Sequence, residues 1–136
     1  MTEVNDMKNI EPGISAFAEI TVTENELALK VGSGSLEVFA TPAMTALMEK
    51  AACLCVAPYL EGEETTVGTE LNIKHTSATP CGMKVCAEAV LTEVNGRELV
   101  FSVKASDEAS AIGEGTHRRF LVYGEKFTSK TKSKLK

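Results

Sequence analysis

The chain has 136 residues, with 14 basic and 19 acidic side chains and a formal net charge of −5. This length suits a single domain with a substantial core, which we expect over residues 1–127, followed by a basic, disordered tail over residues 128–136. The acidic balance argues against nucleic-acid binding, and no apolar run approaches the ~18 residues of a membrane-spanning helix.

The start of the chain and its cysteines indicate a cytoplasmic protein. Residues 1–6 are polar and acidic, unlike the basic start of a signal peptide. Cys53 and Cys55 would point in opposite directions on a helix, and Cys81 and Cys86 lack the spacing of zinc ligands. We therefore expect free, buried thiols in a reducing compartment, and no metal site.

The first third of the chain predicts one strand and a loop. Residues 14–22 show partial alternation and have the composition of a strand. Residues 26–31 fit either a second short strand or an irregular extension. The composition Gly-Ser-Gly-Ser over residues 32–35 indicates a flexible loop.

A long helix from Thr41 to Pro58 organises the sequence. The Thr41 hydroxyl is suited to cap the first turn, and Pro42 fits the first helical position, where no N–H is required. The residues between are apolar almost all round, which predicts a helix buried on most of its sides. Glu49 lies within this run, and a buried carboxylate costs roughly several kcal/mol unless it is paired or put to use. Thr41 and Glu49 follow one slowly drifting stripe and form the first candidate site.

Four long strands follow the helix. Asn95-Gly96 is the strongest hairpin signal in the chain. In the last strand His117 and Arg119 share one face. The strands are expected over residues 65–75, 83–94, 97–106 and 110–123.

The strand over residues 65–75 carries two candidate functional residues. Its alternation places Val67, Leu71 and His75 on one face, so His75 ends an apolar face. Gly68 interrupts the strand, which indicates a bulge or the close approach of a ligand.

A strand, a long helix and four antiparallel strands, in that order, indicate an α+β domain of two layers. We expect a curled antiparallel sheet of about five strands wrapped around one central helix, which is the hotdog arrangement. A single copy would leave the edges of this sheet unpaired. We therefore also expect a homodimer formed side by side.

A set of short motifs stands out between Glu37 and Phe127: EVFAT (37–41), LME (47–49), APYL (57–60), GT (68–69), HTSATP (75–80), IGEGTHRR (112–119) and EKF (125–127). In register and with the same loop lengths, these motifs resemble the fluoroacetyl-CoA thioesterase branch of the hotdog superfamily. The resemblance implies a homodimeric hotdog protein that hydrolyses a short acyl-CoA thioester, with coenzyme A as part of the substrate and no separate cofactor.

The resemblance also implies an active site made of Thr41, Glu49 and His75, each inside a matching motif. It implies that Gly68 offers an amide near the thioester carbonyl and that Arg119 binds substrate. The chemistry of these residues agrees, because thioester hydrolysis needs a nucleophile or activated water, a base and donors for the oxyanion. Glu49 suits a base, and His75 could activate Thr41 or water.

One departure from the family concerns the loop before the helix. Gly32 and Ser35 stand where the fluoroacetyl enzyme carries two phenylalanines that form a lid over the fluorinated acyl group. Each lost phenylalanine removes roughly 1.5–3 kcal/mol of possible burial. We therefore expect an open mouth and little preference for fluoroacetyl over acetyl thioesters, although Phe39 or Phe17 could partly substitute.

A second interpretation of the same fold is a non-catalytic module that binds acyl-CoA or another small ligand. Retention of all three polar groups argues against it. An enoyl-CoA hydratase would need an Asp/His pair in the loop after the helix, which the sequence lacks. The sequence leaves open the acyl group, CoA versus an acyl-carrier protein, an acyl-Thr41 intermediate versus direct water attack, and a site within one subunit versus one shared by two.

Overall fold

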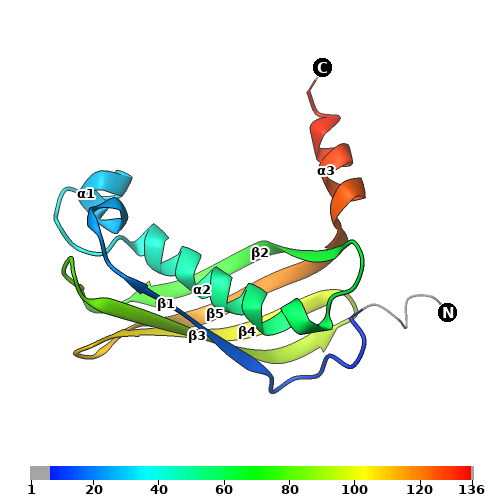
Figure 1. Cartoon of the computed structure of the whole chain (residues 1–136), viewed down its shortest axis with the longest axis horizontal. Coiled ribbons are helices and arrows are strands. Elements are labelled where there is room, and N and C mark those ends of the chain that lie inside the picture. Colours follow the sequence, from blue (N-terminus) through cyan, green and yellow to red (C-terminus); the bar gives the residue numbers. More distant parts are fainter. Residues whose placement is uncertain (1–6, 136) are drawn as a thin grey trace.

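The computed structural model describes residues 7–135 and shows a curled antiparallel sheet wrapped around one long helix (Figure 1). Residues 1–6 and Lys136 lie outside the described part, and so do the predictions made for them. The elements are strands β1 (Ser15–Thr21), β2 (Glu64–His75), β3 (Lys84–Asn95), β4 (Glu98–Asp107) and β5 (Ala111–Tyr123), helices α1 (Ala28–Val31), α2 (Thr41–Val56) and α3 (Gly124–Lys132), and the 3-10 turns η2 (Glu24–Glu26) and η3 (Ala57–Tyr59).

The five strands form one sheet in the order β1-β3-β4-β5-β2, and every neighbouring pair is antiparallel. Helix α2 crosses one face of this sheet and packs mainly against β1 and β3. The predicted hairpin is confirmed: Asn95 pairs with Glu98, and Gly96 takes a φ of 65°, which suits glycine. The hotdog arrangement predicted from the order of elements is therefore the observed fold.

The core lies between α2 and the inner face of the sheet. On β3 the odd-numbered residues point inward from Val85 to Leu91, and a bulge after Leu91 then turns Val94 toward the core. On β5 His117, Arg119 and Leu121 share the buried face, as predicted for His117 and Arg119. Each large apolar side chain that is fully buried contributes roughly 1.5–3 kcal/mol. The largest of these are Phe39, Phe101, Met44, Met48, Leu91, Leu99, Ile112 and Leu121.

Helix α2 begins differently from the prediction. Ala40 is the N-cap residue and no side chain caps the helix, because the Thr41 hydroxyl turns instead toward His75. The helix ends at Val56, and a 3-10 turn containing Pro58 follows it. The prediction that α2 is buried on most sides is wrong for a single chain, because one face, including Leu54 at 46 % exposure, remains open.

Residues 24–26 and 28–31 are helical, and Leu27 between them is extended and bridges Phe39. Thr23 forms a capping box with Glu26, since its hydroxyl accepts from the Asn25 N–H while the Glu26 carboxylate accepts from the Thr23 N–H at 2.7 Å. The expectation of a second strand or an irregular extension over residues 26–31 is therefore wrong. The capping signal lies in Thr23, three residues before the segment in question.

Gly68 breaks the register of β2. It pairs with Arg119 on β5, whereas Glu70 pairs with Arg118, so one extra residue is inserted between them. This bulge confirms one of the two alternatives that a glycine inside a strand suggests. It also corrects the predicted single apolar face, because the residue buried before the bulge is Thr66 and not Val67.

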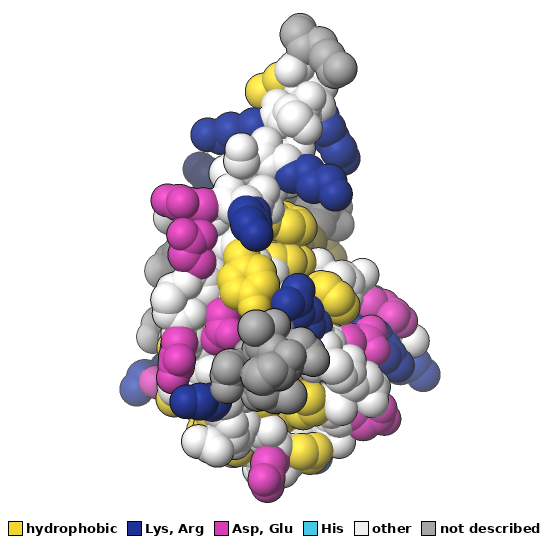
Figure 2. Space-filling model, turned by 90° about the vertical axis from the view of Figure 1, so that its right-hand side faces the viewer, with side chains coloured by type: hydrophobic (Ala, Val, Ile, Leu, Met, Phe, Trp, Pro, Cys, Tyr) yellow, Lys and Arg dark blue, Asp and Glu magenta, His cyan; other side chains and the backbone are white. Residues whose placement is uncertain are grey.

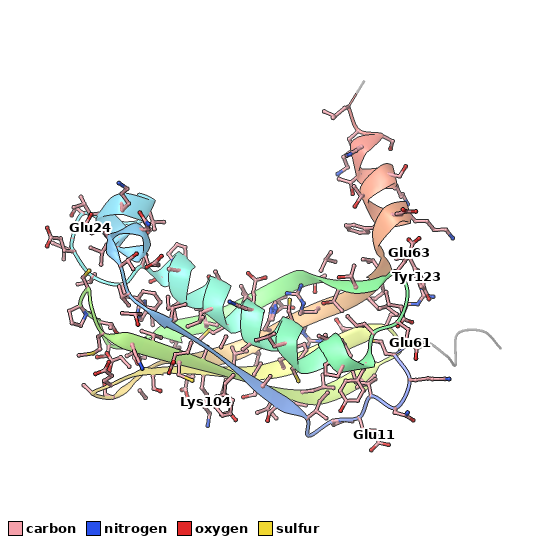
Figure 3. All side chains as sticks on the ribbon, viewed as in Figure 1. Glu11, Glu24, Glu61, Glu63, Lys104 and Tyr123 are labelled. Atoms are coloured by element: carbon pink, nitrogen blue, oxygen red, sulfur yellow. The ribbon has the colours of Figure 1, made fainter. Side chains whose placement is uncertain are left out.

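Helix α3 leaves the sheet at the corner where β5 ends beside the start of β2, and it projects from the body (Figures 1 and 2). Figure 3 labels Tyr123 and Glu63 at its base, where the Gly124 N–H donates to the Glu63 carbonyl at 2.9 Å. The lysines of α3 are exposed, and Figure 2 shows Lys and Arg side chains on several sides of the projecting part.

The helical course of α3 corrects the prediction of a disordered tail from residue 128. That prediction used the shortage of apolar residues, but lysine and glutamate are good helix formers. Glu125 in the first turn and Lys130 and Lys132 in the last turn also complement the helix dipole.

The four cysteines are free thiols, as expected, but their burial differs from the expectation. Cys53 and Cys81 are exposed, and only Cys55 is buried, where desolvation raises the pKa of its thiol. Across residues 7–135, no helix combines the length and apolar character needed to cross a bilayer.

Candidate active site

The hydroxyl of Thr41 and the imidazole of His75 meet at the start of α2. Thr41 Oγ1 lies 2.8 Å from His75 Nδ1, a hydrogen-bond distance. The fold sets this meeting, because α2 begins at Thr41 and β2 ends at His75. Phe39 packs edge-on against the imidazole, with ring centroids 6.4 Å apart, and restricts its rotation.

The environment of His75 favours its neutral form. Burial lowers the pKa of His75 below 6.5, and the Ser77 backbone offsets this only in part. A neutral imidazole that accepts the Thr41 hydroxyl proton at Nδ1 carries its own proton on Nε2. Nε2 is buried and makes no hydrogen bond to any residue within the described 7–135. In this tautomer Nδ1 is free to take the Thr41 proton, which is the state that general-base action requires.

A cavity of about 270 Å³ opens beside this pair. Its walls include Thr41, His75, Phe39, Ser33 and Ser77. Free backbone N–H groups at the start of α2 give this end of the helix a partial positive charge, which suits an oxyanion that develops nearby. The cavity thus combines a hydroxyl, a base and an electropositive helix end.

Glu49 belongs to a different group of side chains, two turns further along α2. Its carboxylate is 38 % exposed, and its Oε2 atom lies 3.6 Å from Nη1 of Arg119. The same oxygen is 4.0 Å from Nε2 of His117. Both partners come from β5, and both side chains are buried. The carboxylate therefore has one side against a buried cation and the other toward solvent.

The absence of a side chain at Gly68 makes room for this carboxylate. A Cβ atom at position 68 would lie 2.6 Å from Glu49 Oε2, 3.2 Å from Cε1 of His117 and 3.3 Å from Nη1 of Arg119. The bulge and the missing side chain thus serve the same end, because the backbone of β2 can approach the carboxylate closely. The role of the Gly68 amide toward a thioester carbonyl stays a prediction.

Within one chain the structure does not bring all three predicted catalytic residues together. Thr41 and His75 are in contact, but Glu49 is eight residues from Thr41, which at 1.5 Å per residue is about 12 Å along the helix. The sequence placed Thr41 and Glu49 on one stripe of the helix without resolving this distance.

Arg119 is placed differently from a residue that binds substrate at a surface. Its side chain is 7 % exposed, and its guanidinium is engaged by Thr66, His117 and Glu49. Contact with substrate at Arg119 stays a prediction, while its contact with Glu49 is part of the structure.

The loop over residues 32–35 is tied down at both ends. The Ala28 N–H donates to the Val38 carbonyl at 2.8 Å, and the Leu29 N–H donates to the Leu36 carbonyl at 3.1 Å. Gly32 ends α1 with a φ of 92°, and Ser33 reaches the cavity wall. The loop presents no aromatic side chain at Gly32 or Ser35, as the sequence shows.

Sequence reasoning did not identify Thr66 and His117 as members of the Glu49 group. His117 was placed on the inward face of its strand, next but one to Arg119, but no role was assigned to it. The available signal was an inward-facing arginine, because a buried guanidinium requires several acceptors. Those acceptors had to lie on the neighbouring strand or at the same face of β5.

A curled sheet around one helix, with a Thr-His pair at the helix start and a carboxylate held over a glycine, defines a hotdog protein equipped for thioester hydrolysis. The family model described as fluoroacetyl-CoA-specific thioesterase matches residues 22–125. The chain belongs to this family.

Known proteins support the same conclusion. The fluoroacetyl-CoA thioesterase of Streptantibioticus cattleyicolor is 46 % identical over 98 residues, which are 72 % of this chain and 70 % of that protein. A crystal structure of the fluoroacetyl-CoA thioesterase FlK superposes with a TM-score of 0.89 at 35 % identity, covering 95 % of this chain and 100 % of that one. A thioesterase-superfamily protein from Thermus thermophilus is 25 % identical, with a TM-score of 0.85 and 93 % of each chain covered.

Proposed function

We propose that this protein hydrolyses short-chain acyl-CoA thioesters to the free acid and coenzyme A. The observation that carries the proposal is the 2.8 Å contact between Thr41 Oγ1 and His75 Nδ1 beside a cavity at the start of α2. Together with Glu49 over Gly68, this contact supplies the hydroxyl, the bases and the electropositive site that acyl transfer to water requires.

Each polar group of the site has a role in this proposal that its geometry supports. His75 in its neutral form takes a proton from the Thr41 hydroxyl or from a water in its place. The free N–H groups at the start of α2 and the Gly68 amide stabilise the oxyanion. Glu49, which Arg119 faces from the buried side, takes the proton of the water that attacks the acyl carbon, and the proton held by His75 passes to the coenzyme A sulfur as the C–S bond breaks.

A non-catalytic module that binds acyl-CoA is the less favoured function. Such a module would need no general base, yet this chain keeps a hydroxyl, an imidazole and a carboxylate and belongs to a thioesterase family. A binding site also gains nothing from the paired state of Thr41 and His75, because that hydrogen bond occupies a group that would otherwise face the ligand.

The active assembly is a homodimer joined through β2. This strand is an edge of the sheet, spans Glu64–His75, and leaves Leu71 37 % exposed. Two β2 strands that pair antiparallel about Leu71 and Asn72 place Gly68 of one strand opposite His75 of the other. This arrangement brings the Glu49 group of one copy toward the Thr41-His75 pair of the second. It is the reason for favouring a shared site.

The cellular location is the cytoplasm. Exposed and unpaired Cys53 and Cys81 support this, because exposed thiols persist in a reducing compartment.

The test is hydrolysis of a panel of short, branched and aromatic acyl-CoAs. A thiol reagent detects the free coenzyme A that hydrolysis releases. We expect turnover of acetyl-CoA by the wild-type protein, with Thr41→Ala measured in parallel as the blank for contaminating thioesterases. No release from any member of the panel would favour the binding module.

Fluoroacetyl-CoA belongs in the same panel. Because Gly32 and Ser35 form no aromatic lid, we expect the ratio of kcat/KM for fluoroacetyl-CoA to that for acetyl-CoA to stay below about 10³, which corresponds to roughly 4 kcal/mol of discrimination. A larger ratio would mean that another element recognises the fluorine.

A further inference from the structure

A buried polar cluster lies behind the carboxylate of Glu49. It consists of Thr66 on β2 and His117 and Arg119 on β5, all on the face of the sheet that carries α2. The side chain of His117 is fully buried and that of Arg119 nearly so. Burial of a guanidinium costs free energy unless hydrogen-bond acceptors surround it. The acceptors of Arg119 therefore determine how this cluster is held together.

The N–H donors of the planar Arg119 guanidinium have partners on Thr66, His117 and Glu49. Its Nε donates to Thr66 Oγ1 at 2.8 Å, and its Nη2 donates to the Thr66 carbonyl at 3.0 Å. Its Nη1 lies 3.2 Å from Nε2 of His117 and 3.6 Å from Glu49 Oε2. Because the guanidinium is a rigid fork, anchors on Thr66 and His117 decide where Nη1 faces.

The protonation state of His117 follows from its two neighbours. Its Nδ1 lies 2.8 Å from the carbonyl oxygen of Glu70, which can only accept, so Nδ1 carries the proton. Arginine can only donate, so Nε2 of His117 presents its lone pair to Arg119. The ring is therefore neutral, and its approach to Glu49 at 4.0 Å is not an ion pair.

The surroundings of His117 agree with the neutral form. Burial is the largest effect and lowers the pKa of His117; the hydrogen bond to the Glu70 carbonyl opposes it in part, the positive charge of Arg119 lowers the pKa further, and the Glu49 carboxylate opposes this least. The ring also stacks on Phe101 at a centroid distance of 6.1 Å. His117 thus accepts a hydrogen bond at Nε2, and contacts on both edges and on one face hold its ring in place.

We propose that His117 is a positioning residue for the hydrolytic reaction. Its neutral Nε2 accepts from Arg119 and fixes the guanidinium so that Nη1 faces Glu49, while Thr66 fixes the other end of the same plane. The carboxylate is thereby held over Gly68, with its second side free for a proton. This inference rests on the proposed role of Glu49 as a base.

The variants that test it nearly preserve volume and change the hydrogen bonds of the side chain. His117→Phe preserves the packing on Phe101 but offers neither a lone pair to Arg119 nor an N–H to the Glu70 carbonyl. His117→Gln restores both an acceptor oxygen and a donor N–H that can reach the Glu70 carbonyl. Arg118→Gln, which removes an arginine from the opposite face of the same strand, is the matched control. The Arg118 guanidinium forms ion pairs with Glu70 and Glu98.

We expect His117→Phe to lower kcat for acetyl-CoA between about 10- and 10²-fold with KM nearly unchanged, the scale of a misplaced catalytic group. The acidic limb of the pH–kcat profile should also shift, because the cation opposite the carboxylate is no longer held. His117→Gln should recover most of the loss, and Arg118→Gln should behave as the wild type.

The double variant Glu49→Gln/His117→Phe isolates the route of action. If His117 acts through Glu49, the double variant is no slower than Glu49→Gln alone. A folded His117→Phe protein with unchanged kcat and pH profile would overturn the proposal. If His117→Phe does not fold, Thr66→Val provides the same test by removing only the acceptor for Arg119 Nε. If Glu49→Gln alone keeps near-normal turnover, the proposed base role fails instead.

Discussion

The start and the middle of helix α2 carry two groups of reactive side chains in opposite kinds of surroundings. At its start, Thr41 and His75 face a cavity and depend on one hydrogen bond, with Nε2 of the imidazole left without a described partner. Two turns on, Glu49 is backed by a dense buried network in which Arg119 makes contacts to Thr66 and His117 as well. The first group is exposed and sparse, and the second is buried and fully bonded on its inner side.

This difference shows how one helix can serve two chemical tasks. A hydroxyl that attacks or orients must be reachable, and losing a proton to a neutral histidine needs no strong local field. A carboxylate that must face the interior needs a cation behind it, and that cation needs its own acceptors. Helix geometry alone does not distinguish the positions of Thr41 and Glu49. The neighbouring residues of the sheet do.

The largest effect on kcat is expected from a change at Glu49. Glu49→Gln keeps the size and hydrogen-bonding capacity of the side chain but removes the proton acceptor, so kcat should fall on the order of 10²-fold or more. Steady-state hydrolysis of acetyl-CoA measures this, with thermal unfolding as the control for folding. Near-normal turnover by a folded variant would make Glu49 a structural partner of Arg119 only.

The second-largest effect on kcat is expected from a change at Thr41. Thr41→Ala removes the hydroxyl that contacts His75 and should lower kcat roughly 10²-fold, whereas Thr41→Ser keeps the hydroxyl and should stay within about 10-fold of the wild type. Comparing the two variants at saturating acetyl-CoA separates the hydroxyl from the methyl group. Equal rates for both would show that the methyl group or the helix start matters instead.

Gly68→Ala probes the junction between β2 and the carboxylate. The added Cβ would meet Glu49 Oε2 at 2.6 Å, but that oxygen is the end of a flexible side chain and can move aside. We therefore expect about a 10-fold loss of kcat with little change in the melting temperature. A large drop in melting temperature with normal kcat would instead mean that the backbone at the bulge is strained.

The smallest effect concerns pH and stability. The folded-state pKa values of His75 and His117 lie below 6.5, so between those values and 6.5 the unfolded chain binds more protons. Stability is therefore full above about pH 6.5 and is lost as the pH falls toward the folded pKa values. We expect the melting temperature to drop by a few degrees between pH 7.5 and 5.5.

His117→Gln is the control for this comparison, because it removes one of the two histidines of the chain. The pH dependence of its melting temperature should be shallower than that of the wild type. An equally steep decline would assign the effect to His75 or to carboxylates.

Much of this molecule follows from its sequence, and the exceptions have physical causes. Period-two alternation predicted the shared face of His117 and Arg119 on β5, and Asn95-Gly96 predicted the hairpin. Alternation failed on β2 because the bulge at Gly68 exchanges its two faces. Residues 28–31 were misjudged because no side chain caps α1, so the sequence carries no start signal for it, and the capping box at Thr23 belongs to η2.

For the site, the sequence identified the reactive side chains but not their grouping. Helix periodicity aligned Thr41 with Glu49, yet only the sheet behind α2 decides that one meets His75 and the other Arg119. The network around Arg119 joins residues that are 53 positions apart in the chain, from Thr66 to Arg119. Contacts at such separation depend on strand order and register, which local patterns do not encode.

Helix α3 has a consequence for the lifetime of the protein. It stands off the body, all of its residues after Gly124 are exposed, and it carries Lys126, Lys130 and Lys132. Enzymes that cut after lysine need an accessible segment that can unfold locally, and a short helix attached at one end provides it. Limited digestion with trypsin should therefore begin in α3 and release it in pieces, while the body through Tyr123 survives with its cavity intact.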